Sequence, residues 1–167
     1  MQFQLRNFQI TDAESLALAA NDAMVSQYLR EVFPFPYTLQ DAEWYLDYCL
    51  QADPKREWIQ AIDIAGRAVG SISASFPDDL RRQSAELGYW LAQPYWGKGI
   101  MTRAITEFCR AVFAASGVVR IYAEVFAENK GSQIVLERNG FRREGHHRKS
   151  LYKHGVYHDS YTYALIR

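Results

Sequence analysis

Two glycines that flank a lysine, within the stretch 95–102, have the spacing in this sequence that most directly indicates chemistry. Behind them, apolar residues return at steps of three to five positions, which predicts an amphipathic helix from Ile100 onward. Ahead of them, residues 85–91 follow the period of two that is typical of a strand. A glycine turn between a strand and a helix leaves backbone N–H groups at the positive end of the helix dipole, where a phosphate can approach closely. The turn is therefore a candidate anion site.

The glycine spacing excludes two common nucleotide-binding motifs. The dinucleotide fingerprint G-x-G-x-x-G requires glycine at position 102, which is Thr102. A P-loop requires Ser or Thr directly after its Gly-Lys pair, whereas Lys98 is followed by Gly99. A plain strand-to-helix turn that binds nothing is the alternative interpretation of this pattern.

Length and composition indicate one globular domain over residues 1–167. No apolar run approaches the roughly 20 residues that span a bilayer, so membrane insertion is not expected. The N-terminal residues lack the layout of a signal peptide, and we expect a cytoplasmic protein. The 19 basic and 19 acidic residues balance, which gives no overall attraction to nucleic acid.

The elements that would position the turn alternate between strands and helices. After a short strand near residues 3–8, further strands are expected over 59–64, 69–74, 85–91, 119–127, 141–151 and 157–165. Helices are expected after an N-capping Thr11, over about 22–30, after Thr38, from Ile100 to Gly117, and from Asn129 to Asn139. Four connections are too short for crossovers, so we predict an α/β domain whose mixed sheet is mostly antiparallel and flanked by helices.

The stretch 95–102 resembles the pyrophosphate-binding turn of the GNAT N-acetyltransferase superfamily. Its sequence is similar to that of the branch that contains the ribosomal-protein alanine N-acetyltransferases. In that superfamily the turn reads Gln or Arg, two residues, Gly, one residue, then Gly or Ala. Trp96 and Met101 depart from the outer two positions. Residues 129–141, an Asn that opens a helix ending in Gly-Phe, resemble the second signature of the family. With segments 33–38 and 155–159, which also resemble this branch, the resemblance covers nearly the whole chain.

The resemblance implies a GNAT-like domain whose sheet is splayed between strands 85–91 and 119–127, with acetyl-CoA as co-substrate and no metal. It implies that acetyl-CoA contacts the end of the first of these strands, the glycine turn and the start of the later helix. The residues concerned are Tyr89, Trp90, Leu91, Trp96, Gly97, Lys98, Gly99, Ile100, Met101, Thr102, Asn129 and Ser132.

Acetyl transfer from a thioester requires a base for the amine, a donor for the oxyanion, and an acid or hydrogen bond for the departing thiolate. Glu86 is the expected base, because it lies on the strand face opposite Leu87 and Tyr89 and matches a strand carboxylate that the superfamily often uses. Glu124 on the neighbouring strand is the other candidate for the base. The alternative interpretation is that Glu86 is a solvated strand residue with no catalytic role.

The residue that assists the departing thiolate differs from the commonest superfamily pattern. Many members have a Tyr seven residues after the helix-opening Asn, where this chain has Leu136. The branch resembled has Ser three residues after the Asn, and the matching Ser132 implies a hydroxyl hydrogen bond to the sulfur. Asn129 is expected to orient the cofactor or the acceptor, and it also fits an ordinary helix N-cap.

The acceptor implied by the resemblance is a primary amine. An α-amine of a protein N-terminus, a peptide or a small amino compound is expected, because it loses its proton more easily than a lysine side chain. The residues expected to wall a groove for the acceptor are Phe33, Phe35, Pro36 and Tyr37. Five acids between Tyr28 and Asp53 leave a polyamine acceptor open, and Leu136 leaves open a non-catalytic acyl-CoA-binding regulatory module.

Other patterns concern partners and metals. The basic cluster over 138–153 is interpreted as a solvated hairpin rather than an RNA surface, and contact with ribosomal protein is left open. The chain is expected to be a monomer or a homodimer. The four histidines lie in one hairpin without a known ligand spacing, so no metal is expected. Cys49 and Cys109 are interpreted as buried thiols.

Overall fold

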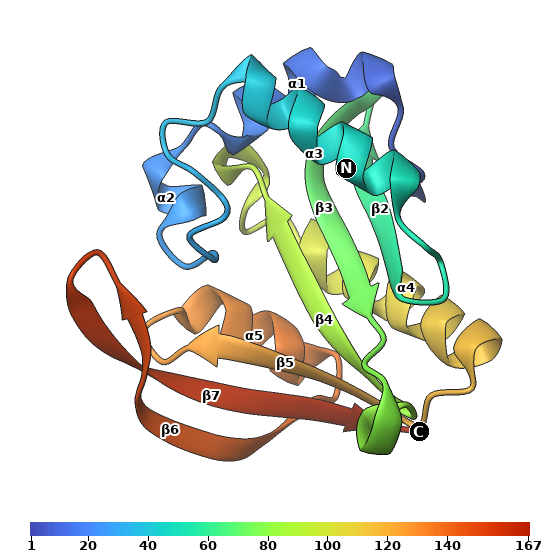
Figure 1. Cartoon of the computed structure of the whole chain (residues 1–167), viewed down its shortest axis with the longest axis vertical. Helices are drawn as coiled ribbons and strands as arrows, with labels where there is room; N and C mark the ends of the chain where they lie inside the picture. The colour runs from blue at the N-terminus through green and yellow to red at the C-terminus, as the bar shows by residue number, and fades with distance from the viewer.

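A seven-stranded sheet forms the centre of the fold in a computed structural model that describes residues 1–167 (Figure 1). The strand order is β1-β2-β3-β4-β5-β7-β6, with β4 and β5 as the parallel pair and antiparallel pairing elsewhere. The strands are β1 (Gln4–Arg6), β2 (Glu57–Ile64), β3 (Arg67–Ser75), β4 (Ser84–Leu91), β5 (Arg120–Phe126), β6 (Arg142–Lys153) and β7 (Val156–Ile166). The expected mixed, mostly antiparallel sheet is confirmed.

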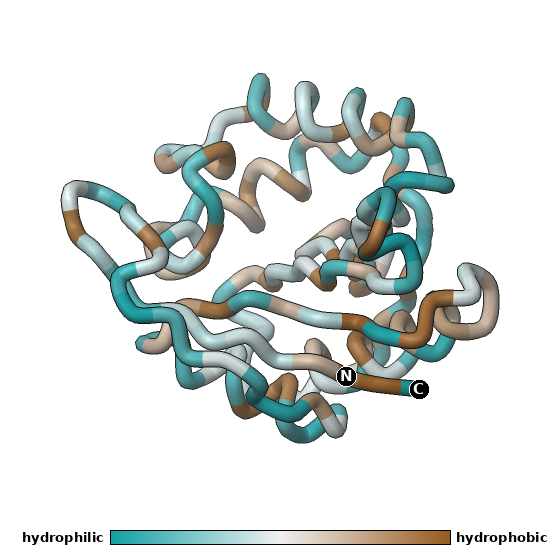
Figure 2. Tube along the Cα trace, turned by 60° about the horizontal axis from the view of Figure 1, so that its bottom comes forward, coloured by the Kyte–Doolittle hydropathy of each residue, from teal (hydrophilic) through white to brown (hydrophobic).

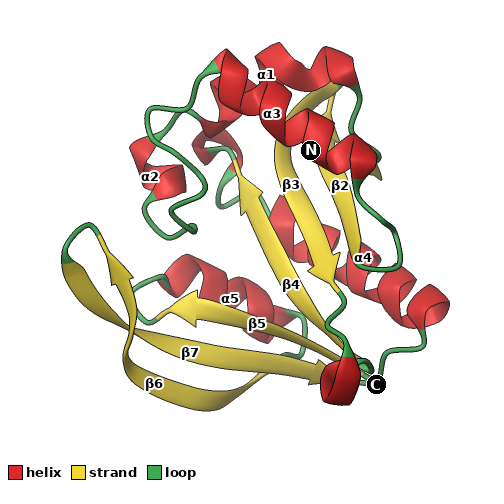
Figure 3. Cartoon of the chain, viewed as in Figure 1, coloured by secondary structure: helices red, strands yellow, loops and turns green.

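Helices cover both faces of this sheet (Figure 3). They are α1 (Ala13–Ala20), α2 (Ala23–Ser26), α3 (Leu39–Gln51), α4 (Ile100–Ser116) and α5 (Lys130–Arg138), with short 3-10 turns at Ile10–Asp12, Asp79–Arg81 and Gln93–Tyr95. A core of 22 buried residues joins the sheet to α4 and α5, and a core of 8 joins its other face to α1 and α3. Hydrophobic and hydrophilic residues alternate along the trace, so most elements have an apolar side to bury (Figure 2).

The start of α3 follows the expected local rule. The Thr38 hydroxyl accepts the Asp41 N–H (3.2 Å), and the Asp41 carboxylate accepts the Thr38 N–H (2.8 Å), which forms a capping box. The buried face of this helix is narrow, because Leu39 and Leu50 are 45% and 54% exposed. Only Ala42 and Leu46 of this helix are fully enclosed by the smaller core.

Two helix expectations were wrong. Thr11 does not cap α1: residues Ile10–Asp12 form a 3-10 turn, and the Asp12 carboxylate accepts the Gln9 N–H (2.8 Å). The helix expected over 22–30 ends at Ser26, since the Lys153 ammonium donates to the carbonyls of Ser26 (2.6 Å) and Leu29 (2.5 Å). The Ser26 carbonyl also accepts the Leu29 N–H (3.0 Å) in one tight turn, and the Lys153 side chain from the β6–β7 hairpin supplies a further donor to both carbonyls.

A three-residue ion cluster ties β1 to the rest of the domain. The Arg6 guanidinium donates to both carboxylate oxygens of Asp12 (2.7 Å each) and to the Asp63 carboxylate (2.7 Å). Both carboxylates are buried, at 4% and 2% exposure. The cluster matters for stability because removing one member leaves a buried charge without its partner.

No helix of the structure combines the length and the apolar character that a membrane crossing demands. Both cysteines are free thiols; Cys109 is buried as expected, whereas Cys49 is half-buried.

Candidate active site

The glycine turn connects the end of β4 to the start of α4. Gly97 and Gly99 have φ of 71° and 70°, in the left-handed region that favours glycine. A Cβ atom built on either residue meets no atom within 4 Å, so the backbone conformation and not crowding requires glycine here. The chain therefore passes through the turn with open space above both glycines.

Consecutive backbone N–H groups of this turn have no protein acceptor. The first intrahelical hydrogen bond of α4 runs from the Arg103 N–H to the Gly99 carbonyl (3.2 Å), so the N–H groups of residues 100–102 have no acceptor within the helix. Those of residues 97–99 make no backbone hydrogen bond. Since α4 is 17 residues long, its dipole adds positive potential at this end. The turn has the donors and the potential to bind a phosphate.

The polar side chains of the turn are used to hold it in place. The Trp96 indole N–H donates to the Leu91 carbonyl (2.6 Å), and the Lys98 ammonium donates to the Pro94 carbonyl (2.7 Å). The Lys98 ammonium also lies 5.7 Å from the centre of the Tyr95 ring. Any anion at the turn is thus met first by backbone groups.

Beside the turn, β4 and β5 part from one another. Their parallel pairing is limited to three registers, Ser84–Arg120, Ala85–Ile121 and Glu86–Tyr122. Beyond Glu86, β4 pairs only with β3 while β5 continues against β7, and the two strands diverge as a V (Figure 1). The expected splay is confirmed, and the edge of β4 over residues 87–91 that faces β5 has no strand partner.

The alternation along β4 separates its side chains between two faces. Ala85, Leu87 and Tyr89 pack with the larger core beneath α4, whereas Trp90 packs with the smaller core. Glu86 shares the face of Trp90 because successive strand residues point to opposite sides. The face that carries Glu86 is therefore the one that the α2–α3 segment covers.

Glu86 forms an ion pair with that segment. Its Oε1 accepts a hydrogen bond from the Arg30 guanidinium at 2.9 Å, with side-chain exposures of 33% for Glu86 and 80% for Arg30. Tyr122, which pairs with Glu86 across the two strands, has a raised phenol pKa, first because of burial and second because of the Glu86 charge. Oε2 of Glu86 makes no hydrogen bond to the protein, so the carboxylate retains a free acceptor.

Glu124, the rival carboxylate, lies on the same side of the sheet as Glu86. Tyr122 is opposite Glu86, and Glu124 is two residues further along β5, where the strands have begun to part. The Glu124 carboxylate accepts the hydroxyl of Ser160 on β7 at 2.5 Å, and the fully buried Ser160 also bonds Ser150 (2.7 Å). Both carboxylates therefore lie near the apex of the V, Glu86 at the last paired register and Glu124 just beyond it.

The start of α5 lies on the other face. Asn129 caps this helix as expected, since its side-chain oxygen accepts the Ser132 N–H at 3.1 Å. The Ser132 hydroxyl is 2.6 Å from the Tyr89 hydroxyl, which joins α5 to β4 across the parting strands. Burial is the main cause that raises the pKa of Tyr89, so its phenol stays protonated. Leu136 is fully buried in the larger core.

The four residues expected to wall an acceptor groove do not share one surface. Phe33 is half-buried, with its ring 5.4 Å from Trp90 and 4.9 Å from Tyr37. Tyr37 is only 6% exposed and belongs to the smaller core. Phe35 and Pro36 are exposed on the loop. Phe33 is the member of this set that lies against the Glu86 face of β4.

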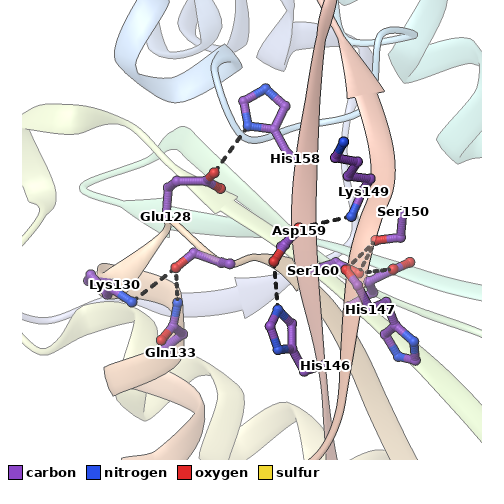
Figure 4. A network of polar contacts seen from close by, with 12 residues as sticks. Glu128, Lys130, Gln133, His146, His147, Lys149, Ser150, His158, Asp159 and Ser160 are labelled. Atoms are coloured by element: carbon purple, nitrogen blue, oxygen red, sulfur yellow. Dashed lines mark hydrogen bonds and ion pairs between the residues drawn. The ribbon is translucent and has the colours of Figure 1, made fainter.

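The histidines lie on the β6–β7 hairpin and contact different partners (Figure 4). His146 is 2.6 Å from Asp159, His147 is 2.9 Å from Thr162, and His158 is 3.3 Å from Glu128. No group of three or more potential ligands in the chain is arranged to hold a metal ion.

Sequence reasoning missed three side chains of this site. Arg30 carried no signal, because nothing local links it to a strand residue 56 positions away. Ser160 was likewise unassigned. Tyr89 was expected as an acetyl-CoA contact, but the bond of its hydroxyl to Ser132 was not, although the β4 alternation places its ring on the side of α4 and α5.

Comparison with known proteins places this geometry in context. Residues 2–142 match the acetyltransferase (GNAT) domain family. YdaF of Bacillus subtilis (strain 168), provisionally named a ribosomal N-acetyltransferase, is 36% identical over 102 residues, which are 61% of this chain and 55% of that protein. The [ribosomal protein uS5]-alanine N-acetyltransferase of Escherichia coli (strain K12) is 35% identical over 79 residues, 47% of this chain and 41% of that enzyme. The chain thus spans about half the length of these curated relatives.

A solved structure shares the fold over nearly the full chain. It is RimL, a ribosomal L7/L12 alpha-N-protein acetyltransferase in complex with coenzyme A, with a TM-score of 0.86 and 22% identity, covering 99% of this chain and 94% of that one.

Proposed function

Since this chain belongs to the acetyltransferase (GNAT) domain family, we propose that it is an acetyl-CoA-dependent N-acetyltransferase that acts on a primary amine. The observation that carries the proposal is the pairing of an anion-binding turn with an unpaired strand edge. The N–H groups of residues 97–102 suit a pyrophosphate, and the free edge of β4 suits the amide groups of a pantetheine arm. Both lie at the same end of β4.

The residues proposed to hold acetyl-CoA are those of the turn and its flanks. The backbone of Gly97 to Thr102 would bind the pyrophosphate, while Trp96 and Lys98 keep the turn rigid through the bonds they make to Leu91 and Pro94. Backbone groups of Tyr89, Trp90 and Leu91 would pair with the arm, and Asn129 and Ser132 would approach it from α5. The bound co-substrate supplies a thioester-activated acetyl group.

Glu86 is the proposed base for the acceptor amine. It lies on the face opposite α4 and α5, so the acceptor and acetyl-CoA would reach the V from different sides of the sheet. The ion pair with exposed Arg30 contributes about 0–1 kcal/mol, so an incoming ammonium can replace the guanidinium at little cost. Glu124 remains the rival, because it faces the same side and is exposed.

On the opposite face, Ser132 is proposed to donate a hydrogen bond to the departing thiolate, in agreement with Leu136 being buried and without a proton to give. The cap formed by Asn129 fixes the first turn of α5 and thereby the position of Ser132. A fixed donor is effective in such a step because no reorganisation is needed as charge develops.

The acceptor proposed is an α-amine, of a protein N-terminus, a peptide or a small amino compound. At pH 7, deprotonating a lysine amine of pKa near 10.4 costs about 4.6 kcal/mol, whereas an α-amine near 7.7–8 costs about 1–1.4 kcal/mol. A single carboxylate therefore suffices more easily for the α-amine. The names of two relatives, a ribosomal-protein alanine N-acetyltransferase and an alpha-N-protein acetyltransferase, support this choice and make ribosomal protein a candidate partner.

Residues 33–37 are proposed to border the acceptor. Phe33 lies nearest to the Glu86 face, through its contact with Trp90, and the exposed Phe35 and Pro36 would meet the part of the acceptor outside the V. Tyr37 would not touch the acceptor, and it would hold Phe33 in place as the buried residue against which Phe33 packs. We further propose that residues 1–167 act as one cytoplasmic domain.

Release of free thiol from acetyl-CoA with a panel of amines tests the proposal. Peptides with a free N-terminus, the same peptides blocked at the N-terminus but carrying lysine, and spermidine are compared at physiological salt. We expect the highest kcat/KM for the free N-termini. A higher kcat/KM for spermidine would assign the chain to the polyamine acetyltransferases. Binding of acetyl-CoA with no thiol released in the presence of any of the amines would make the chain a non-catalytic acyl-CoA-binding module.

A further inference from the structure

The Tyr89 and Ser132 hydroxyls form a contact that the proposed roles of these residues do not use. The two oxygens are 2.6 Å apart, and they come from β4 and from the first turn of α5. Neither hydroxyl makes a hydrogen bond to any other protein group. A short hydrogen bond between two otherwise unbonded hydroxyls leaves one proton of the pair uncommitted.

The relative acidity of the two hydroxyls decides which of them donates in this hydrogen bond and which keeps a free proton. A phenol is more acidic than an aliphatic hydroxyl, so Tyr89 is the better donor and Ser132 the better acceptor of the pair. Burial raises the pKa of Tyr89, so the phenol does not ionise in the physiological range and keeps its proton for this bond. The Ser132 hydrogen is then the one that points away and can be donated to a third group.

The position of the pair matches the requirement of the departing sulfur. Leu136, where many superfamily members have Tyr, is buried and cannot donate. Tyr89 supplies a phenol from another element, β4, and reaches the first turn of α5 through Ser132. A hydroxyl that accepts one hydrogen bond becomes a stronger donor in the next, because successive hydrogen bonds polarise one another.

We propose that Tyr89 is a positioning residue which orients and polarises Ser132 to donate a hydrogen bond to the departing thiolate. The inference rests on the proposed acetyltransferase function. In the step concerned, the acceptor nitrogen forms a bond to the acetyl carbon and the carbon–sulfur bond breaks, with its electron pair going to sulfur. The acceptor ammonium loses one proton to become the nucleophile and a second proton once the nitrogen is bonded to the acetyl carbon. One of the two goes to the carboxylate base and the other to water, and the thiolate takes one proton from solvent after release. Tyr89 and Ser132 lose no proton, and they stabilise the charge on sulfur while it exists.

The structure offers a matched control. Tyr45 on α3 and Ser71 on β3 form a second hydroxyl pair, 2.9 Å apart, in a part of the fold that packs with the smaller core. Tyr45→Phe removes a phenol hydroxyl from a tyrosine–serine hydrogen bond just as Tyr89→Phe does. Any loss of stability common to the two variants therefore reflects a broken structural bond.

Two readouts test the role of Tyr89. The first is kcat for acetyl transfer in wild type, Tyr89→Phe, Ser132→Ala, the double variant and Tyr45→Phe. The second is the pKa of the CoA thiol bound to each protein, measured by thiolate absorbance with desulfo-CoA as the blank that subtracts the protein's own tyrosines. A residue that only supports the fold does not shift a bound thiol's pKa.

We expect Tyr89→Phe to lower kcat roughly two- to tenfold and to raise the bound thiol pKa by roughly half to one unit, as the loss of one hydrogen bond predicts. Adding Tyr89→Phe to Ser132→Ala should change neither value further, because Tyr89 acts through Ser132. Tyr45→Phe should leave both values at those of wild type.

Additive effects of the two substitutions, or an unshifted thiol pKa in Tyr89→Phe, would overturn the inference while leaving the acetyltransferase function intact. If wild type acetylates no amine yet binds CoA, the proposed function fails, and the thiol pKa alone then decides whether the hydroxyl pair acts on the sulfur.

Discussion

Replacement of Gly99 by valine is expected to abolish stabilisation by acetyl-CoA without unfolding the protein. Gly99 has φ of 70° and open space around its missing Cβ, so the penalty in the free protein is conformational. A left-handed conformation costs an L-residue about 1–2 kcal/mol, and a β-branched residue lies at the upper end. At about 2 kcal/mol the melting temperature of a chain of this size should fall by roughly 4–8 °C.

Gly117 at the other end of α4 provides the matched variant. Its φ is 72°, and a Cβ there also meets nothing within 4 Å. It lies about 25 Å from Gly99, the length of a 17-residue helix. Gly117→Val should therefore show a similar drop in melting temperature for the same physical reason, with the anion-binding turn untouched.

Thermal unfolding with and without acetyl-CoA separates the two variants. At a hundred times its dissociation constant, acetyl-CoA should add about 2.7 kcal/mol to wild type and to Gly117→Val. If Gly99→Val weakens binding a hundredfold, because the added side chain holds the pyrophosphate away from the N–H groups, the same concentration adds only about 0.4 kcal/mol. An undiminished acetyl-CoA shift in Gly99→Val would refute the assignment of this turn as the pyrophosphate site.

Two further predictions concern the base and the ion cluster. Glu86→Gln should lower kcat roughly a hundredfold while acetyl-CoA still raises the melting temperature; full activity in this variant, with the loss appearing in Glu124→Gln, would transfer the role to β5. Arg6→Met should lower the free energy of unfolding at pH 7 by about 3–5 kcal/mol, measured by urea denaturation, because it leaves the buried Asp12 carboxylate without its partner. Burial opposes ionisation of Asp12, but hydrogen bonds from Arg6 and from the Gln9 N–H bring its pKa in the folded protein below the ordinary 3.8. The stabilisation that the ionised Asp12 contributes is therefore present above pH 3.8, and it is lost as the pH falls through the lower pKa of the folded protein. The difference between wild type and Arg6→Met should accordingly shrink only in acid, and a difference that is unchanged at about pH 2 would show that the Asp12 charge is not its source.

Local rules determined the parts of the site that lie along one stretch of chain. The β4 alternation, the two glycines and the α4 periodicity predicted strand, turn and helix in the right order, because backbone conformation at these positions depends on neighbours within a few residues. The Asn129 cap follows for the same reason. The splay of the sheet came from the family resemblance and is confirmed by the three-residue pairing of β4 with β5.

Local rules failed where another side chain took the place of the expected local partner. Thr11 had the residue type of a cap, but Asp12, held by Arg6 of β1, forms the turn instead. The helix expected to continue to Arg30 stops at Ser26 because Lys153, 127 residues away, bonds the carbonyls there. No sequence window contains both Lys153 and Ser26, whereas Arg6 and Asp12 are only six residues apart and their pairing was missed because residue type alone favoured Thr11 as the cap.

Only the tertiary structure decided which side chains meet where β4 and β5 part. Arg30 reaches Glu86 over 56 residues, and Tyr89 reaches Ser132 over 43. These contacts depend on the segment after α2 and the start of α5 lying on opposite faces of the diverging strands, which no local pattern specifies. The sequence by itself therefore determined the turn that could bind a phosphate, while packing determined that a phenol lies behind the serine and a guanidinium lies on the carboxylate.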